Sequence, residues 1–153
     1  MNNKTILLTR RLTNVPKHKP LLLELTAEER KQLRGRKKSL CGVDLLLQLP
    51  RKGALSAGEL LVGEENSPQV LVTAAKENLF EVTAKSFIDL LKATYHLGNR
   101  HVELEISRNK IYLKEDLVLE KMLLQRGLLI KNILRVFEPE EGAYMTHSLN
   151  SND

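Results

Sequence analysis

The strongest constraint on the fold is a change in the spacing of apolar residues near residue 70. Before it, short apolar runs are separated by glycine, proline and polar residues, which is typical of a small β-rich module of hairpins. After it, strand-like and helix-like spacings alternate. A chain of 153 residues has room for two small domains, and we predict them at 1–75 and 76–143, followed by a flexible tail at 144–153. The apolar runs of the first domain are 6–8, 21–25, 43–49, 60–62 and 70–72.

The second half predicts the order strand, helix, strand, strand, helix, strand. This order is the split βαβ of a ferredoxin-like (βαββαβ) domain, so the expected fold class is α+β. The first helix is expected to end at Gly98 as a left-handed cap. Phe87, Leu90, Leu91 and Thr94 recur in it at the spacing of one helix face.

The other elements of this domain follow from alternation and helix-end signals. Residues 101–106 alternate strictly between polar and apolar and predict a strand, and 111–113 predict the next one. The second helix is expected to begin near Asp116 and to end at Gly127, before a last strand at 128–137. The side chains that this helix is expected to bury are Val118, Met122 and Leu123.

Two local features stand out in the first half. Thr26 and Glu29 have the spacing of a capping box, which predicts a helical turn between the strands. Cys41, the single cysteine, is expected in or near the core. One cysteine cannot close an intrachain disulfide, and the sequence has no Cys-x-x-Cys pair for zinc or redox chemistry.

The net charge of +5 is concentrated in the first half. Lys and Arg outnumber Asp and Glu by 13 to 7 in residues 1–75, whereas the counts are 11 and 12 in residues 76–153. One run carries much of this excess: Arg30, Lys31, Arg34, Arg36, Lys37 and Lys38. Nucleic acid, an acidic protein surface or only water are all suitable neighbours for it, and solvated surface is the simplest interpretation.

The sequence lacks the motifs of the common enzyme classes. It has no His-Glu-x-x-His zinc motif, no Gly-x-Ser-x-Gly elbow, and neither glycine-rich pattern that binds nucleotide phosphates. Hydrolytic and nucleotide-dependent functions therefore lose most of their support. Because no apolar run approaches the roughly 20 residues of a transmembrane helix, we expect a cytoplasmic protein with no membrane partner.

His101 is the most informative of the histidines. Strict alternation places it beside Glu103 and Glu105 on the polar face of its predicted strand. A neutral imidazole there is a ligand for nickel, copper or zinc, although a surface histidine is the simpler interpretation of this residue alone. In a dimer with a two-fold axis, the two copies of His101 would supply two imidazoles to one ion. His147 in the tail is a further candidate ligand, and His96 is open between packing at the helix end and a secondary metal role.

Three strings resemble the UreE family of urease accessory proteins. They are Tyr-His-Leu-Gly-Asn-Arg-His-Val at 95–102, Phe-Glu-Pro-Glu-Glu-Gly-Ala-Tyr at 137–144, and Leu-Pro-Arg at 49–51 with Gly-Glu at 58–59. The resemblance implies a cytoplasmic homodimer that binds nickel and donates it during assembly of the urease metallocentre, and not an enzyme. It also implies dimerisation through the ferredoxin-like domain and a protein partner for the first domain. The implied partners are the urease apoprotein and urease accessory proteins including a GTPase, with no nucleic acid.

The same resemblance assigns the metal ligands. The family's metal histidine closes the Gly-Asn-Arg-His string and corresponds to His101, and His147 is the one match to the histidines of the family's tail. Many members end in a histidine-rich tail, so this sequence implies a low nickel capacity. Glu103 also departs from the family, which usually has proline there. Zinc and copper are expected to compete with nickel in vitro.

Two other functions are alternatives from the residues. A ferredoxin-like RNA-binding module would account for the basic first half, but aromatic residues make up only 4% and no RNP1-like string supplies base stacking. A metal-independent interaction adaptor is the other. Steep salt dependence of RNA binding would favour the first, and activity after metal chelation would favour the second.

Overall fold

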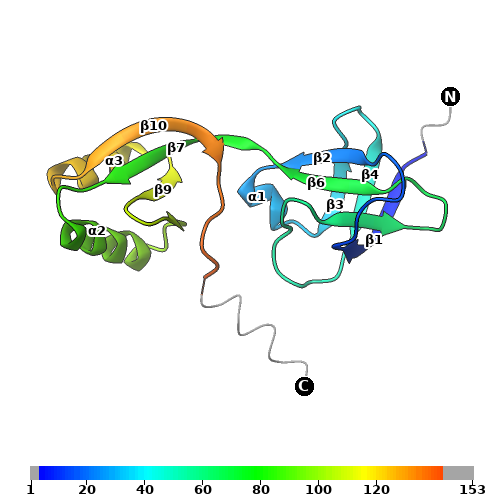
Figure 1. Ribbon diagram of the computed structural model, residues 1–153, viewed down its shortest axis with the longest axis horizontal. Helices are drawn as coiled ribbons and strands as arrows, with labels where there is room; N and C mark the ends of the chain where they lie inside the picture. The colour runs from blue at the N-terminus through cyan, green and yellow to red at the C-terminus, as the bar shows by residue number, and fades with distance from the viewer. Residues whose placement is uncertain (1–3, 143–153) are drawn as a thin grey trace, which may run out of the picture. The chain divides into compact units, whose positions relative to one another are not determined.

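The computed structural model describes residues 4–142 and divides the chain into two compact units, Met1–Ala75 and Lys76–Asp153 (Figure 1). Each unit has its own sheet and its own apolar core. The combination of these sheets with short helices confirms the α+β class. The tail predicted at 144–153 lies outside the described residues. Among residues 4–142, no helix combines the length and the apolar content needed to span a bilayer.

The first unit is a six-stranded sheet with one short helix, in the strand order β2-β6-β5-β1-β4-β3. Each predicted apolar run matches one of its strands, although 43–49 extends one residue beyond β4 at each end. Strand β3 is formed by the second part of the basic run and was not predicted. The elements are β1 (Ile6–Leu12), β2 (Leu21–Leu25), α1 (Ala27–Arg30), β3 (Arg34–Lys38), β4 (Asp44–Gln48), β5 (Leu60–Gly63) and β6 (Val70–Ala74).

Strand pairing in this unit is mixed. The pairs β1–β5, β5–β6 and β3–β4 are antiparallel, but β1–β4 and β2–β6 are parallel. The expectation of a module made of hairpins is therefore wrong for these two pairs. Parallel neighbours need a long crossover, which local turn signals do not reveal. The fully buried residues of the core are mainly leucine: Leu8, Leu23, Leu25, Leu45, Leu47, Leu49 and Leu61.

The helical turn predicted after β2 is confirmed. The Thr26 side chain accepts from the Glu29 N–H at 3.2 Å, and the Thr26 N–H donates to the Glu29 carboxylate at 3.0 Å. This backbone hydrogen bond lowers the pKa of Glu29 against the opposing effect of burial. Cys41, in contrast, is exposed and not in the core. It lies in the turn between β3 and β4, with its Sγ 3.2 Å from Ser39 Oγ.

The second unit is a four-stranded antiparallel sheet in the order β10-β7-β9-β8. Both helices pack on the sheet through one core, in which Leu90, Leu97 and Leu123 meet Phe80 and Ile111. The elements are β7 (Lys76–Thr83), α2 (Phe87–Asn99), β8 (Glu105–Ile106), β9 (Ile111–Lys114), α3 (Leu117–Gln125) and β10 (Leu129–Val136).

The buried faces of the two helices agree only in part with the sequence-based expectation. The buried residues of α2 are Leu90, Ala93 and Leu97, whereas Phe87 and Leu91 are 62% and 48% exposed. In α3, Leu123 is fully buried and Met122 packs against the core. Val118 was predicted to be buried but is 68% exposed. Apolar residues cover more than one face of each helix, so their spacing alone does not identify the face that packs on the sheet.

Candidate metal centre

His101 lies in the turn that ends α2. Its N–H donates to the Gly98 carbonyl at 3.0 Å, and the Val102 N–H donates to the Leu97 carbonyl at 3.1 Å. These two bonds form a Schellman motif with Arg100 as the C-cap and His101 in the following position. His101 has φ +59°, the left-handed conformation that glycine usually supplies in this motif. Gly98 lies inside α2, so its predicted role as the cap is wrong.

The end of α3 provides a direct comparison. There the Gly127 N–H donates to Leu124 and the Leu128 N–H donates to Leu123, both at 3.0 Å. Gly127 has φ +81° and occupies the position that His101 occupies after α2. A left-handed conformation costs a residue with a Cβ about 1 kcal/mol or more. The chain therefore keeps a strained histidine, with an exposed side chain, where glycine is otherwise preferred, and strain of this kind is concentrated at functional sites.

The predicted polar face of His101, Glu103 and Glu105 is wrong. The strand at 101–106 shrinks to Glu105–Ile106, because the Schellman turn takes up His101 and Val102. Glu105 has a side chain only 12% exposed, and both carboxylate oxygens are used within the chain. Its Oε2 accepts from Arg135 Nη2 at 2.7 Å, and its Oε1 accepts from the Glu138 N–H at 2.8 Å.

Glu105 belongs to a polar cluster on one face of the second sheet. The strand register places Tyr112 beside both Glu81 and Glu105, and these side chains share a face because paired residues point the same way. The Arg135 guanidinium lies 3.9 Å from the Tyr112 ring centroid. Tyr112 Oη donates to Glu81 at 3.4 Å, and Lys110 Nζ lies 3.3 Å from the same carboxylate. The cluster joins the four strands of the sheet and holds the Glu105 carboxylate in place.

The segment after β10 lies beside residues 104–105, which follow the His101 turn. Besides the Glu138 bond to Glu105, the Glu140 N–H donates to the Leu104 carbonyl at 2.7 Å. Leu104 is three residues from His101, so two of the three strings noted in the sequence are held near each other by these bonds. His147 lies outside the described residues, seven positions beyond Glu140. Seven fully extended residues span up to about 24 Å.

His96 is half-buried in the last turn of α2. Its ring packs edge to face on Tyr95, with centroids 5.5 Å apart and planes at 74°. In residues 4–142, no three or more His, Cys, Asp or Glu side chains gather into a group able to hold a metal ion. His96 and His101 of one chain therefore do not make a multidentate site by themselves.

An apolar row runs along the exposed side of α2. Phe87, Leu91 and Tyr95 follow one another at four-residue spacing, are 62%, 48% and 69% exposed, and are flanked by Ile88 at 56%. The row leads toward the end of the helix where His101 begins the next turn. Helical spacing groups Phe87 and Leu91 with the buried Leu90 and does not reveal this exposed surface. A contiguous exposed apolar surface of this kind is typical of an interaction site.

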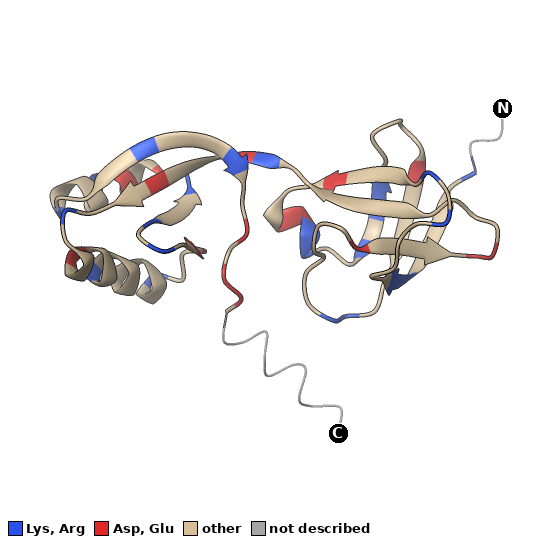
Figure 2. Cartoon of the chain, in the orientation of Figure 1, with Lys and Arg blue, Asp and Glu red and all other residues tan. Residues whose placement is uncertain are grey.

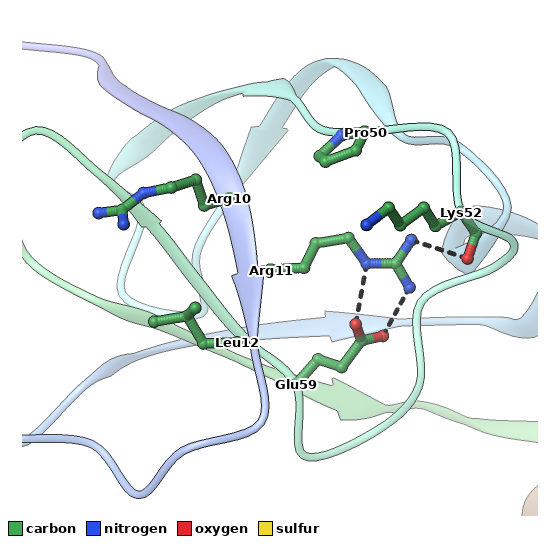
Figure 3. Close-up of a pocket in the computed structure, with 6 residues that line it drawn as sticks. All are labelled: Arg10, Arg11, Leu12, Pro50, Lys52 and Glu59. Atoms are coloured by element: carbon green, nitrogen blue, oxygen red, sulfur yellow. Dashed lines mark hydrogen bonds and ion pairs between the residues drawn. The ribbon is translucent and has the colours of Figure 1, made fainter. Parts of the chain in front are cut away.

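The first unit has a pocket that contains an ion pair between Arg11 and Glu59 (Figure 3). The residues that line this pocket are Arg10, Arg11, Leu12, Pro50, Lys52 and Glu59. Arg11 Nε and Nη2 bond the two Glu59 oxygens at 2.8 and 2.9 Å, and Arg11 also donates to the carbonyls of Gly53 and Ala54. Arg10 points away from this pair (Figure 3). Burial alone would raise the pKa of Glu59, but hydrogen bonds from Arg11 and Ser56 and the charge of Arg11 lower it. The bonds of Arg11 thus hold the loop between β4 and β5 in place. This loop contains the third string, 49–51 with 58–59.

Comparison with known proteins supports the family resemblance of the three sequence strings. Residues 77–153 match the family model described as UreE urease accessory protein, C-terminal domain. The urease accessory protein UreE of Parasynechococcus marenigrum (strain WH8102) is 47% identical over 147 residues, which cover 96% of this chain and 98% of that protein. The same-named protein of Synechococcus sp. (strain WH7805) is 52% identical over 84% of this chain and 74% of its own length. The urease accessory protein UreE of Prochlorococcus marinus (strain MIT 9301) is 43% identical over 93% of this chain and 96% of its own length. The chain therefore belongs to the UreE family of urease accessory proteins, which are accessory proteins rather than enzymes.

Proposed function

We propose that this protein is a nickel-binding metallochaperone that takes part in urease maturation and donates nickel to the urease metallocentre. The observation that carries the proposal is the position of His101, an exposed imidazole in a strained left-handed turn where glycine is the ordinary residue. Imidazole nitrogen is a good ligand for nickel, copper and zinc. Nickel is the cargo here, and the family name supports urease as its destination.

We further propose that the working form is a homodimer in which each chain contributes His101 to one shared ion. Two observations support it. One chain offers no group of three or more ligands in its described residues, and the apolar row on α2 supplies a surface that a second copy would cover. A two-fold axis near the end of α2 would bring the two imidazoles together, because an isologous interface repeats each residue.

Each unit then has its own role. Residues 76–143 are proposed as a ferredoxin-like domain for metal binding and dimerisation, and the antiparallel order β10-β7-β9-β8 supports this assignment. Residues 1–75 are proposed as the domain that binds a protein partner. The proposed partners are the urease apoprotein and urease accessory proteins including a GTPase, in the cytoplasm.

His147 and His96 are proposed as secondary ligands. The anchoring of Glu138 and Glu140 beside Leu104 and Glu105 supports His147, because it starts the tail near the His101 turn. His96 has a weaker case, since its ring already packs on Tyr95. A site with few permanent ligands retains open positions, and open positions permit transfer of the ion to an acceptor.

Nickel calorimetry on the full chain tests the proposal. His101→Ala is expected to weaken nickel binding by at least about a hundredfold, because one substitution removes two ligands from a shared site. His18→Ala is the matched control, an exposed histidine of the first unit that is expected to have no effect. Unchanged affinity in His101→Ala would contradict the assignment of the site.

A further inference from the structure

We infer that the edge strand β3 binds an extended acidic segment of a partner protein, which adds to the sheet as a further strand. The inference rests on the proposed partner-binding role of the first unit, but it does not depend on nickel. β3 is the last strand of its sheet and is paired on one side only, with β4. Figure 2 shows Lys and Arg along this strand. Added strands are a common mode of peptide recognition because main-chain hydrogen bonds supply much of the affinity.

The hydrogen-bond pattern identifies which backbone groups face the open edge. At the two ends of the β3–β4 pair, the Leu49 N–H donates to Leu33 and the Ser39 N–H donates to Val43. Hydrogen-bonded and non-bonded positions alternate in an antiparallel pair, so the residues between them that bond to β4 are Gly35 and Lys37. The N–H and C=O groups of Arg34, Arg36 and Lys38 must therefore point away from β4.

These outward groups are available over the length of β3. Among residues 4–142, no hydrogen bond connects the outward N–H or C=O of Arg34, Arg36 or Lys38 to another part of the chain. The edge is closed just beyond the strand, where the Leu40 N–H donates to the Leu22 carbonyl at 2.8 Å. A side chain at Gly35 would meet nothing within 4 Å, so the sheet face is also unobstructed at the middle of the strand.

The same three residues carry exposed positive charge. Alternate residues of a strand share a face and lie about 7 Å apart, so Arg34, Arg36 and Lys38 form a cationic row beside the open edge. Within the described chain, Arg34 and Arg36 have no carboxylate at ion-pair distance, and Lys38 has only the distant Asp44 at 3.9 Å. Lys37, on the other face, is bonded to Gln32 at 2.7 Å. Glutamates at alternate positions of an added strand would match this row.

An acidic protein segment fits this surface better than a nucleic acid does. Residues 1–75 contain no Phe, Tyr or Trp, so the unit lacks the large aromatic side chains on which bases usually stack. The unpaired N–H and C=O groups are complementary to another backbone in an extended conformation. Charged residues at an edge strand also prevent aggregation, so the experiment has to separate binding from that simpler role.

Fluorescence anisotropy with a labelled seven-residue peptide of alternating Glu and Thr tests the inference on the full chain. The triple variant Arg34→Gln, Arg36→Gln and Lys38→Gln is expected to weaken peptide binding at least about tenfold. The matched control Lys4→Gln, Lys17→Gln and Lys19→Gln removes the same charge from exposed positions outside β3 and is expected to change binding less than about twofold. The same peptide N-methylated at alternate residues keeps its charge but loses main-chain donors, and it should bind at least about fivefold more weakly.

Several outcomes would overturn the inference. Equal loss of peptide binding in both triple variants would mean a response to net charge. Equal binding of the N-methylated peptide would exclude strand addition. Preferential binding of a thymidine oligonucleotide would mean that the surface binds nucleic acid. Circular dichroism establishes that the variants fold. Nickel calorimetry on the β3 variant separates the two proposals, because loss of peptide binding with unchanged nickel affinity supports the inference. Absence of peptide binding in a wild-type protein that still binds nickel through His101 would overturn the inference and leave the proposed function intact.

Discussion

The Glu140 N–H donates a 2.7 Å hydrogen bond to the Leu104 carbonyl, and this contact holds the segment after β10 beside the chain that follows the His101 turn. Glu105 strengthens the arrangement, because its carboxylate accepts from both the Glu138 N–H and Arg135. The segment with Glu138 and Glu140 is thus anchored by ordinary backbone and ion-pair interactions. Metal ligation is not needed to bring it there.

If this anchor positions His147, then Glu105 and His147 must be coupled energetically. We expect His147→Ala to weaken nickel binding in the wild type, and to have a smaller effect when Glu105→Ala has already released the segment. Calorimetry on the two single variants and the double variant gives the coupling energy, with Glu120→Ala as a control for loss of an acidic residue elsewhere in the unit. Strict additivity of the two effects would contradict the anchoring role.

The two Schellman turns predict opposite stability changes. His101→Gly removes strain from a left-handed position, so its free energy of unfolding should rise by up to about 1 kcal/mol while nickel affinity falls. Gly127→Ala introduces the same strain after α3 and should lower stability by about 1 kcal/mol. Urea denaturation measures both, provided that the m-value is unchanged. A clear loss of stability in His101→Gly would show that His101 has a packing role instead.

The Arg11–Glu59 pair predicts a pH-dependent contribution to stability. Because the folded-state pKa of Glu59 lies below its ordinary value of 4.5, the pair stabilises the protein above that pH and loses its contribution as the pH falls through the folded-state pKa. Glu59→Gln should therefore lower stability by roughly 1–3 kcal/mol at pH 7. Its difference from the wild type should shrink in acid. Denaturation curves across this range test the sign, and a gap that widens in acid would refute it.

The apolar row on α2 predicts the oligomeric state. Leu91→Glu places a charge in the middle of the row and should convert a dimer to a monomer, with a parallel loss of nickel affinity. Lys92→Glu, at the next exposed position, is expected to leave the dimer intact and serves as the control. Sedimentation equilibrium measures the change. A Leu91→Glu protein that remains dimeric would exclude this face as the interface.

Sequence patterns predicted most elements because the apolar strands and the capping box are encoded locally. Thr26 and Glu29 are three residues apart and form their bonds without help from the rest of the chain. The parallel pairs β1–β4 and β2–β6 depend on contacts between distant segments, and no local signal reports them. β3 was missed because its residues are Arg, Lys and Gly, which are poor strand signals.

The sequence identified His101 as the candidate metal ligand, but it predicted the wrong local structure for this residue. His101 was selected from its string and from an alternating pattern, yet the residue lies in a turn and not in a strand. Gly98 looked like the natural helix cap, so the left-handed histidine two residues after Asn99 was not anticipated. The Glu105–Arg135 contact joins positions 30 residues apart and is invisible to local spacing. Exposed apolar residues such as Phe87 resemble core residues in any single sequence.

Nickel K-edge X-ray absorption on the full-length protein in solution tests the central claim most directly. The account predicts the multiple-scattering signature of imidazole, dominated by a pair of His101 side chains, and a marked loss of that signature in His101→Ala. Nickel bound to a monomer, or an imidazole signature that persists in His101→Ala, would contradict it.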